Sequence, residues 1–288
     1  MYAITGVTGK VGGALARALL AQRRPVRAVV RDIKKGRFWE SQGCEIALAE
    51  MQDPASLTAA FTGTDGIFIL PPPEFDPAPG FPEARAVIAA LKAALESACP
   101  NKVVYLSTIG AQSTKSNLLT QHTLIEEALG QLPMPITFLR PAWFMENAEW
   151  DVASARDQGM IASFLQPLDK PVPMVATADI GRVASELLQQ NWIGKRVVEL
   201  EGPKRISPQE IGASFAKILG HAVRVEAVPR ETWQVLFESQ GTLHPLPRIQ
   251  MLDGFNEGWI DFEGGQAGTV KGKIELQTVL QELVDRAG

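Results

Sequence analysis

Three glycines near the amino terminus have the spacing of a phosphate-binding turn. Gly6, Gly9 and Gly12 lie between a short apolar run and an alanine-rich helical pattern that starts at Val11. Gly6 allows a tight turn off a strand, Gly9 has no Cβ to hold a pyrophosphate away, and Gly12 lets the helix pack closely on the sheet. Backbone N–H groups from about Lys10 and Val11 would then face the anion. The pattern predicts nucleotide binding, and the alternative is a glycine-rich turn without a ligand.

The end of the next predicted strand, residues 26–30, bears on the choice of cofactor. An acidic residue there accepts hydrogen bonds from the ribose of NAD, whereas an arginine pairs with the 2′-phosphate of NADP. Arg31 comes first, so the sequence favours NADP(H), and Asp32 leaves NAD(H) as the second choice. The basic residues that follow are Lys34, Lys35 and Arg37. A solvated basic loop is the alternative to a ligand role.

Strands that alternate with helices must position these residues. Apolar or β-branched runs predict strands over residues 26–30, 45–48, 66–70, 102–108, 136–141 and 196–200. Helical patterns between them cover residues 11–22, 82–98, 118–129 and 179–191, and Asp53 and Pro54 begin another helix. This alternation predicts an α/β fold with parallel strands and right-handed crossovers.

The carboxyl ends of the strands form the edge where open α/β sheets bind ligands. One strand ends at Leu70, and Pro71 follows it, so both are candidates to pack against the cofactor. Ser107 ends the next strand at the same edge. Trp143 and Phe144 lie just beyond the strand 136–141 and are candidates for an apolar substrate slot, although such aromatic residues more often belong to the core.

The remaining segments are less regular. Residues 74–82 are predicted to form a mobile loop over the cleft, and residues 151–175 an irregular segment that lines the pocket. Later patterns predict a helix over 207–219, a strand over 223–228, a helix over 230–240 and a loop over 242–247. The glycine-rich stretch 255–272 fits no pattern.

Composition narrows the classes of partner. The chain has 288 residues, 45% of them hydrophobic, and a net charge of −4, which argues against nucleic-acid binding. Cys44 and Cys99 have no metal-ligand or redox spacing, and no metal site is expected. No apolar stretch has the length of a membrane span, and the first predicted strand leaves no room for a signal peptide after Met1. We therefore expect a cytoplasmic protein.

Several motifs along nearly the whole chain match one family. They are the opening Gly6-Val7-Thr8-Gly9-Lys10-Val11-Gly12, the tip at Arg31, the strand that ends in Ser107, the run from Thr137 to Asn147 with its Leu139-Arg140-Pro141, and the later segments Thr177–Gly181, Val197–Pro203 and Ser207–Glu210. Together they resemble the NmrA-like branch of the atypical short-chain dehydrogenase/reductases.

The resemblance implies two domains and a set of cofactor contacts. Residues 1–150 and 176–203 would form an NAD(P)-binding Rossmann domain with a doubly wound parallel sheet, and residues 151–175 and 204–288 a smaller C-terminal α+β substrate domain that closes over the nicotinamide. Asn147 would hold the nicotinamide amide or cap a helix. The implied cofactor contacts are Gly6, Thr8, Gly9, Lys10, Val11, Gly12, Arg31, Leu70, Pro71, Ser107, Pro141 and Asn147.

The catalytic acid of typical short-chain dehydrogenases is missing. Their Tyr-x-x-x-Lys pair has no counterpart, because the chain holds only Tyr2 and Tyr105 and the latter is followed four residues later by Ile109. The helix over 118–129 has no lysine, which disfavours carbonyl reduction of the phenylpropanoid type. His122 is the one group there that titrates near pH 7 and is the candidate catalytic residue; a structural or solvated histidine is the alternative.

A missing acid still permits hydride transfer to a strong electrophile. A quinone or a dye needs positioning against the nicotinamide, and water can protonate its reduced form. We therefore predict an NADPH-dependent oxidoreductase that acts on a quinone-like or other conjugated electrophile, such as a dye or an azo compound. The alternative is a non-catalytic NADP(H) redox sensor that acts through a protein partner, and a sugar-nucleotide epimerase is a weaker third. A homodimer is left open.

Overall fold

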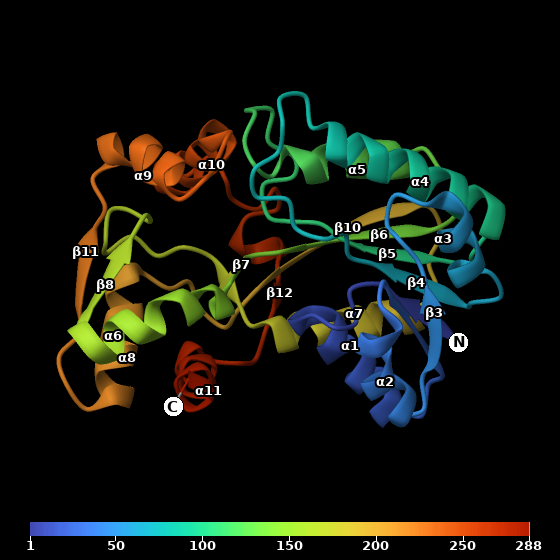
Figure 1. Cartoon of the computed structure of the whole chain (residues 1–288), viewed down its shortest axis with the longest axis horizontal. Coiled ribbons are helices and arrows are strands. Elements are labelled where there is room, and N and C mark those ends of the chain that lie inside the picture. Colours follow the sequence, from blue (N-terminus) through green and yellow to red (C-terminus); the bar gives the residue numbers. More distant parts are fainter. Residues whose placement is uncertain (288) are drawn as a thin grey trace.

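The computed structural model describes residues 1–287. Its centre is an eight-stranded sheet in which all neighbouring strands are parallel (Figure 1). The order across the sheet is β12-β10-β6-β5-β4-β1-β2-β3, so the direction of growth reverses between β1 and β4. The strands are β1 (Tyr2–Ile4), β2 (Val26–Val30), β3 (Glu45–Leu48), β4 (Gly66–Ile69), β5 (Val103–Leu106), β6 (Ile136–Pro141), β10 (Lys195–Glu201) and β12 (Val270–Lys271).

Helices cover both faces of this sheet, as Figure 1 shows. One face carries α1 (Lys10–Ala21), α2 (Ile33–Ser41) and α7 (Thr177–Gln189), and the other carries α3 (Pro54–Phe61), α4 (Pro82–Ala98) and α5 (Thr120–Gly130). Every residue of β4 and β5 is buried, as expected for strands packed on two sides. The fold is therefore a doubly wound α/β fold of the Rossmann type, and β1 and β4 flank its switch point, where ligands bind in such sheets.

A smaller α+β region lies at the far end of the molecule from α3 and α4 (Figure 1). Its strands β8 (Met160–Ser163) and β11 (Arg224–Ala227) pair in parallel, and β7 (Trp143–Phe144) pairs with β9 (Met174–Val175) where this region joins the sheet. Its helices are η1 (Met145–Asp151), α6 (Val152–Gln158), α8 (Pro208–Leu219), η2 (Arg230–Thr232), α9 (Trp233–Ser239), α10 (Pro245–Glu257), η3 (Gln266–Gly268) and α11 (Leu276–Ala287). The proposed division into 1–150 with 176–203 and 151–175 with 204–288 stays a prediction. Strand β12, although it lies within 204–288, pairs with β10 in the main sheet.

Three stretches differ from the sequence-based expectations. Residues 151–175 are not simply irregular, because they hold α6, β8 and β9. The basic stretch after Arg31 is not a loop either: Asp32 accepts a hydrogen bond from the Lys34 N–H and starts α2. The loop predicted over 242–247 gives way at Pro245 to α10. In the first and third stretches, partners distant in the sequence determine the structure.

No helix within residues 1–287 combines the length and the apolar character that crossing a membrane requires.

Candidate cofactor and substrate site

The glycine turn packs tightly between β1 and α1. Gly6 adopts a φ of +65°, and a Cβ at Gly12 would lie 2.3 Å from the Gly6 carbonyl oxygen, so both positions need glycine. Gly9 is the N-cap of α1 and provides no side chain to cap its free N–H groups. Thr8, Gly9 and Lys10 are exposed. The N-terminus of α1 is therefore open to an anion.

A groove of about 430 Å³ lies beside this turn. Arg17, Lys34 and Lys35 contribute its positive charges, and no carboxylate lines it. Phe38, 57% exposed, offers an aromatic face and packs edge-on against Trp39 at 5.1 Å between ring centroids. The remaining lining residues are Val7, Thr8, Gly9 and Gly13. A cationic groove that leads from a glycine turn suits the phosphorylated adenosine half of NADP(H).

Sequence reasoning found part of this groove. Lys34 and Lys35 were noted beside Arg31, but Arg31 is exposed at the end of β2 and is not among the lining residues. Arg17 and Phe38 were missed. Arg17 lies two turns into a helix whose pattern indicated only packing, and Phe38 lies in the unpredicted α2.

The end of β4 is fixed beside the glycine turn. The Leu70 N–H donates to the Thr5 hydroxyl at 2.7 Å, and the Leu70 side chain lies 3.0 Å from where a Cβ of Gly6 would be. Leu70 and Pro71 are half-buried, so each keeps some surface at the carboxyl edge of the sheet. The structure thus brings together the residues predicted at the ends of β1 and β4.

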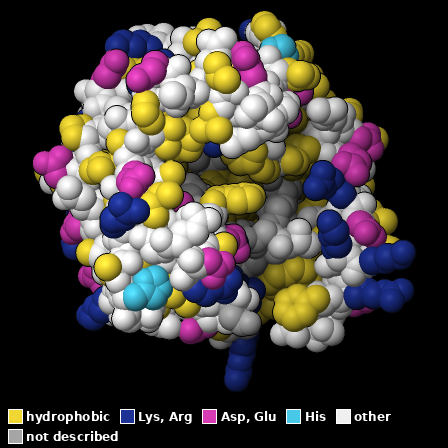
Figure 2. Space-filling model, turned by 60° about the vertical axis from the view of Figure 1, so that its left-hand side comes forward, with side chains coloured by type: hydrophobic (Ala, Val, Ile, Leu, Met, Phe, Trp, Pro, Cys, Tyr) yellow, Lys and Arg dark blue, Asp and Glu magenta, His cyan; other side chains and the backbone are white. Residues whose placement is uncertain are grey.

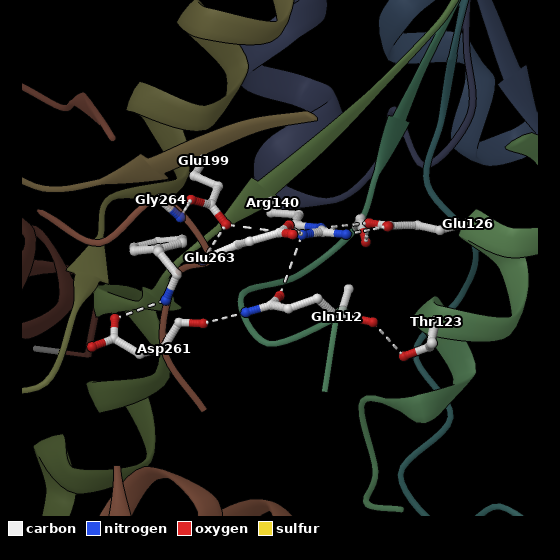
Figure 3. Close-up of polar contacts among 11 residues, drawn as sticks. Gln112, Thr123, Glu126, Arg140, Glu199, Asp261, Glu263 and Gly264 are labelled. Atoms are coloured by element: carbon white, nitrogen blue, oxygen red, sulfur yellow. Dashed lines mark hydrogen bonds and ion pairs between the residues drawn. The ribbon is translucent and has the colours of Figure 1, made fainter. Parts of the chain in front are cut away.

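A buried ionic network lies at the ends of β5 and β6 (Figure 3). The Arg140 guanidinium makes two hydrogen bonds to Glu126 on α5, at 2.9 and 2.6 Å, and a third, at 3.1 Å, to Glu263. Ser107 donates to the same Glu126 carboxylate at 2.5 Å and is 4% exposed. The Ser107 hydroxyl, predicted to contact the cofactor, therefore already has a strong acceptor within the protein. Sequence reasoning missed the network, whose one local signal was an arginine inside the apolar strand β6.

His122 faces the core side of α5. Its Nδ1 atom lies 2.7 Å from the hydroxyl of Tyr105, which is fully buried. Burial lowers the pKa of His122 to about 4, so the ring is neutral at pH 7 and shares a hydrogen bond with the Tyr105 hydroxyl through Nδ1. Burial also raises the pKa of Tyr105 well above its ordinary value. This pair suits a structural hydrogen bond better than proton donation, and a catalytic role for His122 stays a prediction.

Aromatic side chains gather where β7 leaves the sheet. Trp143 and Phe144 are half-buried, and Trp143 packs edge-on against Phe255 of α10 with ring centroids 5.2 Å apart. Pro141, at the end of β6, is buried, and Asn147 in η1 is exposed. Lys10 pairs with Glu149 of η1 at 2.5 Å, which ties the glycine turn to this segment. Phe255 was missed because it comes from a distant helix.

The loop after β4 contacts the smaller region directly. The Asp76 carboxylate accepts hydrogen bonds from the N–H groups of Leu243 and His244, at 2.7 and 2.6 Å, and so ties the residues just before α10 to the loop after β4. The Leu118 N–H donates to the Pro247 carbonyl at 2.8 Å. Figure 2 shows a face of the molecule hollowed near its centre, with hydrophobic side chains along the hollow. Segments from both halves of the chain thus surround the carboxyl edge of the sheet.

Comparison with known proteins agrees with this geometry. The model of the NmrA-like family matches residues 2–261. The NAD(P)H azoreductase of Xenophilus azovorans is 28% identical over 260 residues, which cover 89% of this chain and 85% of that protein. Quinone oxidoreductase 2 of Escherichia coli (strain K12) is 25% identical over 243 residues, with 84% and 82% covered. The solved structure of Citrobacter sp. triphenylmethane reductase complexed with NADP(H) aligns with a TM-score of 0.75 at 21% identity and covers 100% of this chain and 99% of that one.

Proposed function

This chain belongs to the NmrA-like family, and on that premise we propose that it is an NADPH-dependent reductase that transfers hydride to a quinone-like or other conjugated electrophile, such as an azo compound or a dye. The observation that carries the proposal is the cationic groove beside the glycine turn, at the same sheet edge as the aromatic pair Trp143 and Phe255. The azoreductase and quinone oxidoreductase activities in the relatives' names support this class of substrate.

The chain's residues would divide the binding of NADPH among them. The N–H groups at the start of α1 face the pyrophosphate, and Lys34, Lys35 and Arg17 attract the 2′-phosphate. Leu70 and Pro71, half-buried at the end of β4, would pack against the dinucleotide. The bound cofactor supplies the hydride. The half-buried Trp143 holds a flat acceptor against it.

Proton delivery does not require a side chain in this proposal. His122 is neutral at pH 7, and the Ser107 proton is held by Glu126. A neutral acceptor that takes a hydride becomes an anion, whose proton then comes from water, whereas a cationic dye becomes neutral and needs no proton. Acceptors that are already electrophilic are therefore favoured over simple ketones, for which a positioned acid contributes most.

The rival interpretation, a redox sensor, lacks the feature that would favour it. Exposed apolar surface over residues 255–260 would favour a sensor, because a protein partner could bind there. Phe255 is 4% exposed and Ile260 is 2% exposed. Cys44 and Cys99 are both free thiols, which supports the cytoplasm as the compartment in this proposal.

The test combines turnover with cofactor selectivity. NADPH oxidation is followed by absorbance with a panel of quinones, azo dyes and triphenylmethane dyes, and turnover with at least one acceptor is expected. Lys34→Gln and Lys35→Gln should each raise the Kd of NADPH about tenfold while changing that of NADH less than twofold. Arg37→Gln, an exposed arginine outside the groove, is the matched control. Tight NADPH binding without turnover of any acceptor in the panel would contradict the reductase and favour the redox sensor.

A further inference from the structure

Arg248 on α10 stands apart from the other arginines of the chain. It is half-buried, yet within residues 1–287 no carboxylate lies within ion-pairing distance and no oxygen accepts a hydrogen bond from it. Arg140 and Arg205, which are also withdrawn from solvent, each pair with carboxylates, and so does the exposed Arg230. Arg196 is half-buried without a carboxylate too, but it donates to Thr137 and Gln190, whereas Arg17, Arg23, Arg31 and Arg37 are exposed to solvent.

Aromatic rings hold the guanidinium of Arg248 from one side. Its central carbon lies 4.2 Å from the centroid of the Phe237 ring and 5.9 Å from that of Phe164. These cation–π contacts fix the plane of the group and leave its N–H edge without an acceptor. Burial lowers the pKa of Arg248, although the side chain stays charged at neutral pH. A partly desolvated cation whose N–H groups have no acceptor in the protein is a favourable place for an anion to bind.

The position of Arg248 along α10 relates it to the aromatic slot. Phe255, which packs on Trp143, lies seven residues further along the same helix, so the two side chains share a face about 10 Å apart. The N-terminus of α10 is fixed by Asp76 to the loop after β4. The guanidinium of Arg248 therefore lies on the same side of α10 as Phe255, whose ring packs on Trp143.

We propose that Arg248 binds an anionic group of the substrate, so that the preferred acceptors are flat conjugated molecules that carry a sulfonate or a carboxylate. The inference rests on the proposed reductase function and deepens it. The guanidinium presents two parallel N–H donors to the oxygens of such a group. Anionic acceptors should therefore be preferred to neutral ones, and cationic triphenylmethane dyes should bind poorly.

The test uses two acceptors that differ in one charge. These are 4-(dimethylamino)azobenzene and its 4′-sulfonate, measured for KM and kcat with NADPH and, independently of turnover, for Kd by tryptophan fluorescence with NADP⁺ bound. Arg248→Gln should raise the KM and Kd of the sulfonate about 10- to 100-fold and leave kcat and the neutral dye within about twofold. Arg248→Lys should recover part of the loss, and a cationic dye should bind Arg248→Gln more tightly than the parent.

Arg230→Gln is the matched control. Arg230 also lies over an aromatic ring in the same region, 4.9 Å from the centroid of Trp233, but Asp253 pairs with it at 2.6 Å. This variant should have the same KM and Kd as the parent protein for each of the two azo dyes. If Arg248→Gln fails to fold, the Kd values of the parent protein still test the proposal, because equal values for the two dyes would contradict the anion subsite.

The outcomes separate the two proposals. Equal losses for both dyes in Arg248→Gln would overturn the anion subsite while the reductase stands. A selective loss of sulfonate binding without turnover of any acceptor would support the subsite and overturn the reductase.

Discussion

At the scale of single residues, the buried Arg140–Glu126 ion pair makes the stability of the fold sensitive to the loss of either partner. The side chains are 6% and 9% exposed, so removing one leaves an unpaired buried charge. Arg140→Met should lower the free energy of unfolding by about 3–5 kcal/mol, and adding Glu126→Leu should recover part of it. Urea unfolding of the single and double variants measures this coupling. Lys204→Met, which removes an exposed ion pair, should cost under about 1 kcal/mol. Strictly additive losses would contradict the coupling.

The His122 and Tyr105 pair makes stability depend on pH. Burial holds the pKa of His122 at about 4, below its ordinary 6.5, so the unfolded chain takes up a proton that the folded protein resists. The stabilisation is complete above about pH 6.5, declines as the pH falls, and is lost by about pH 4, a difference of about 3 kcal/mol.

His122→Gln should flatten this acid dependence, measured by urea unfolding at pH 5 and pH 7.5, whereas His221→Gln, at an exposed position, should not. The same variants test catalysis. A structural His122 predicts that kcat falls less than about tenfold, and a larger loss with a changed pH profile would make it the catalytic residue.

At the scale of elements, local patterns predicted what local physics determines. The strands β2, β3 and β6 and the helix α4 begin and end where the sequence indicated, because β-branched runs and Pro82 mark them. Gly6, Gly9 and Gly12 likewise form the expected strand-to-helix turn. The predicted contacts of this turn and of Leu70, Pro71 and Asn147 with a cofactor stay predictions.

What the sequence did not reveal depends on partners far along the chain. The segment just before α10 is held by Asp76, more than 160 residues earlier, and the one local signal for that helix start is Pro245 at its first position. Strand β8 is stabilised by β11, and Phe255 reaches Trp143 from another helix. The groove residues Arg17 and Phe38 are joined only when α1 and α2 lie side by side. Residue spacing therefore predicted the geometry of the glycine turn better than the cluster of aromatic side chains around Trp143.

At the scale of the whole molecule, Asp76 connects the cofactor-side sheet to the helix that carries Phe255 and Arg248. Asp76→Ala should free the start of α10 and loosen that wall of the slot, so we expect the KM of an acceptor to rise about tenfold while the Kd of NADPH changes less than twofold. Faster hydrogen exchange at the amides of Leu243 and His244 would show that the hydrogen bonds to Asp76 are lost.

Asp53 supplies the matched control because its carboxylate caps α3 within its own segment, accepting from Ala55 and Ser56. Asp53→Ala should cost about 1 kcal/mol of stability without changing either KM or hydrogen exchange at α10. Asp76→Asn, which keeps one acceptor oxygen, should fall between Asp76→Ala and the parent. If both alanine variants raise the acceptor KM equally, general destabilisation accounts for the effect. A rise in the acceptor KM that is confined to Asp76→Ala would mean that the Asp76 carboxylate, on the loop after β4, keeps α10 and its side chains Arg248 and Phe255 in position.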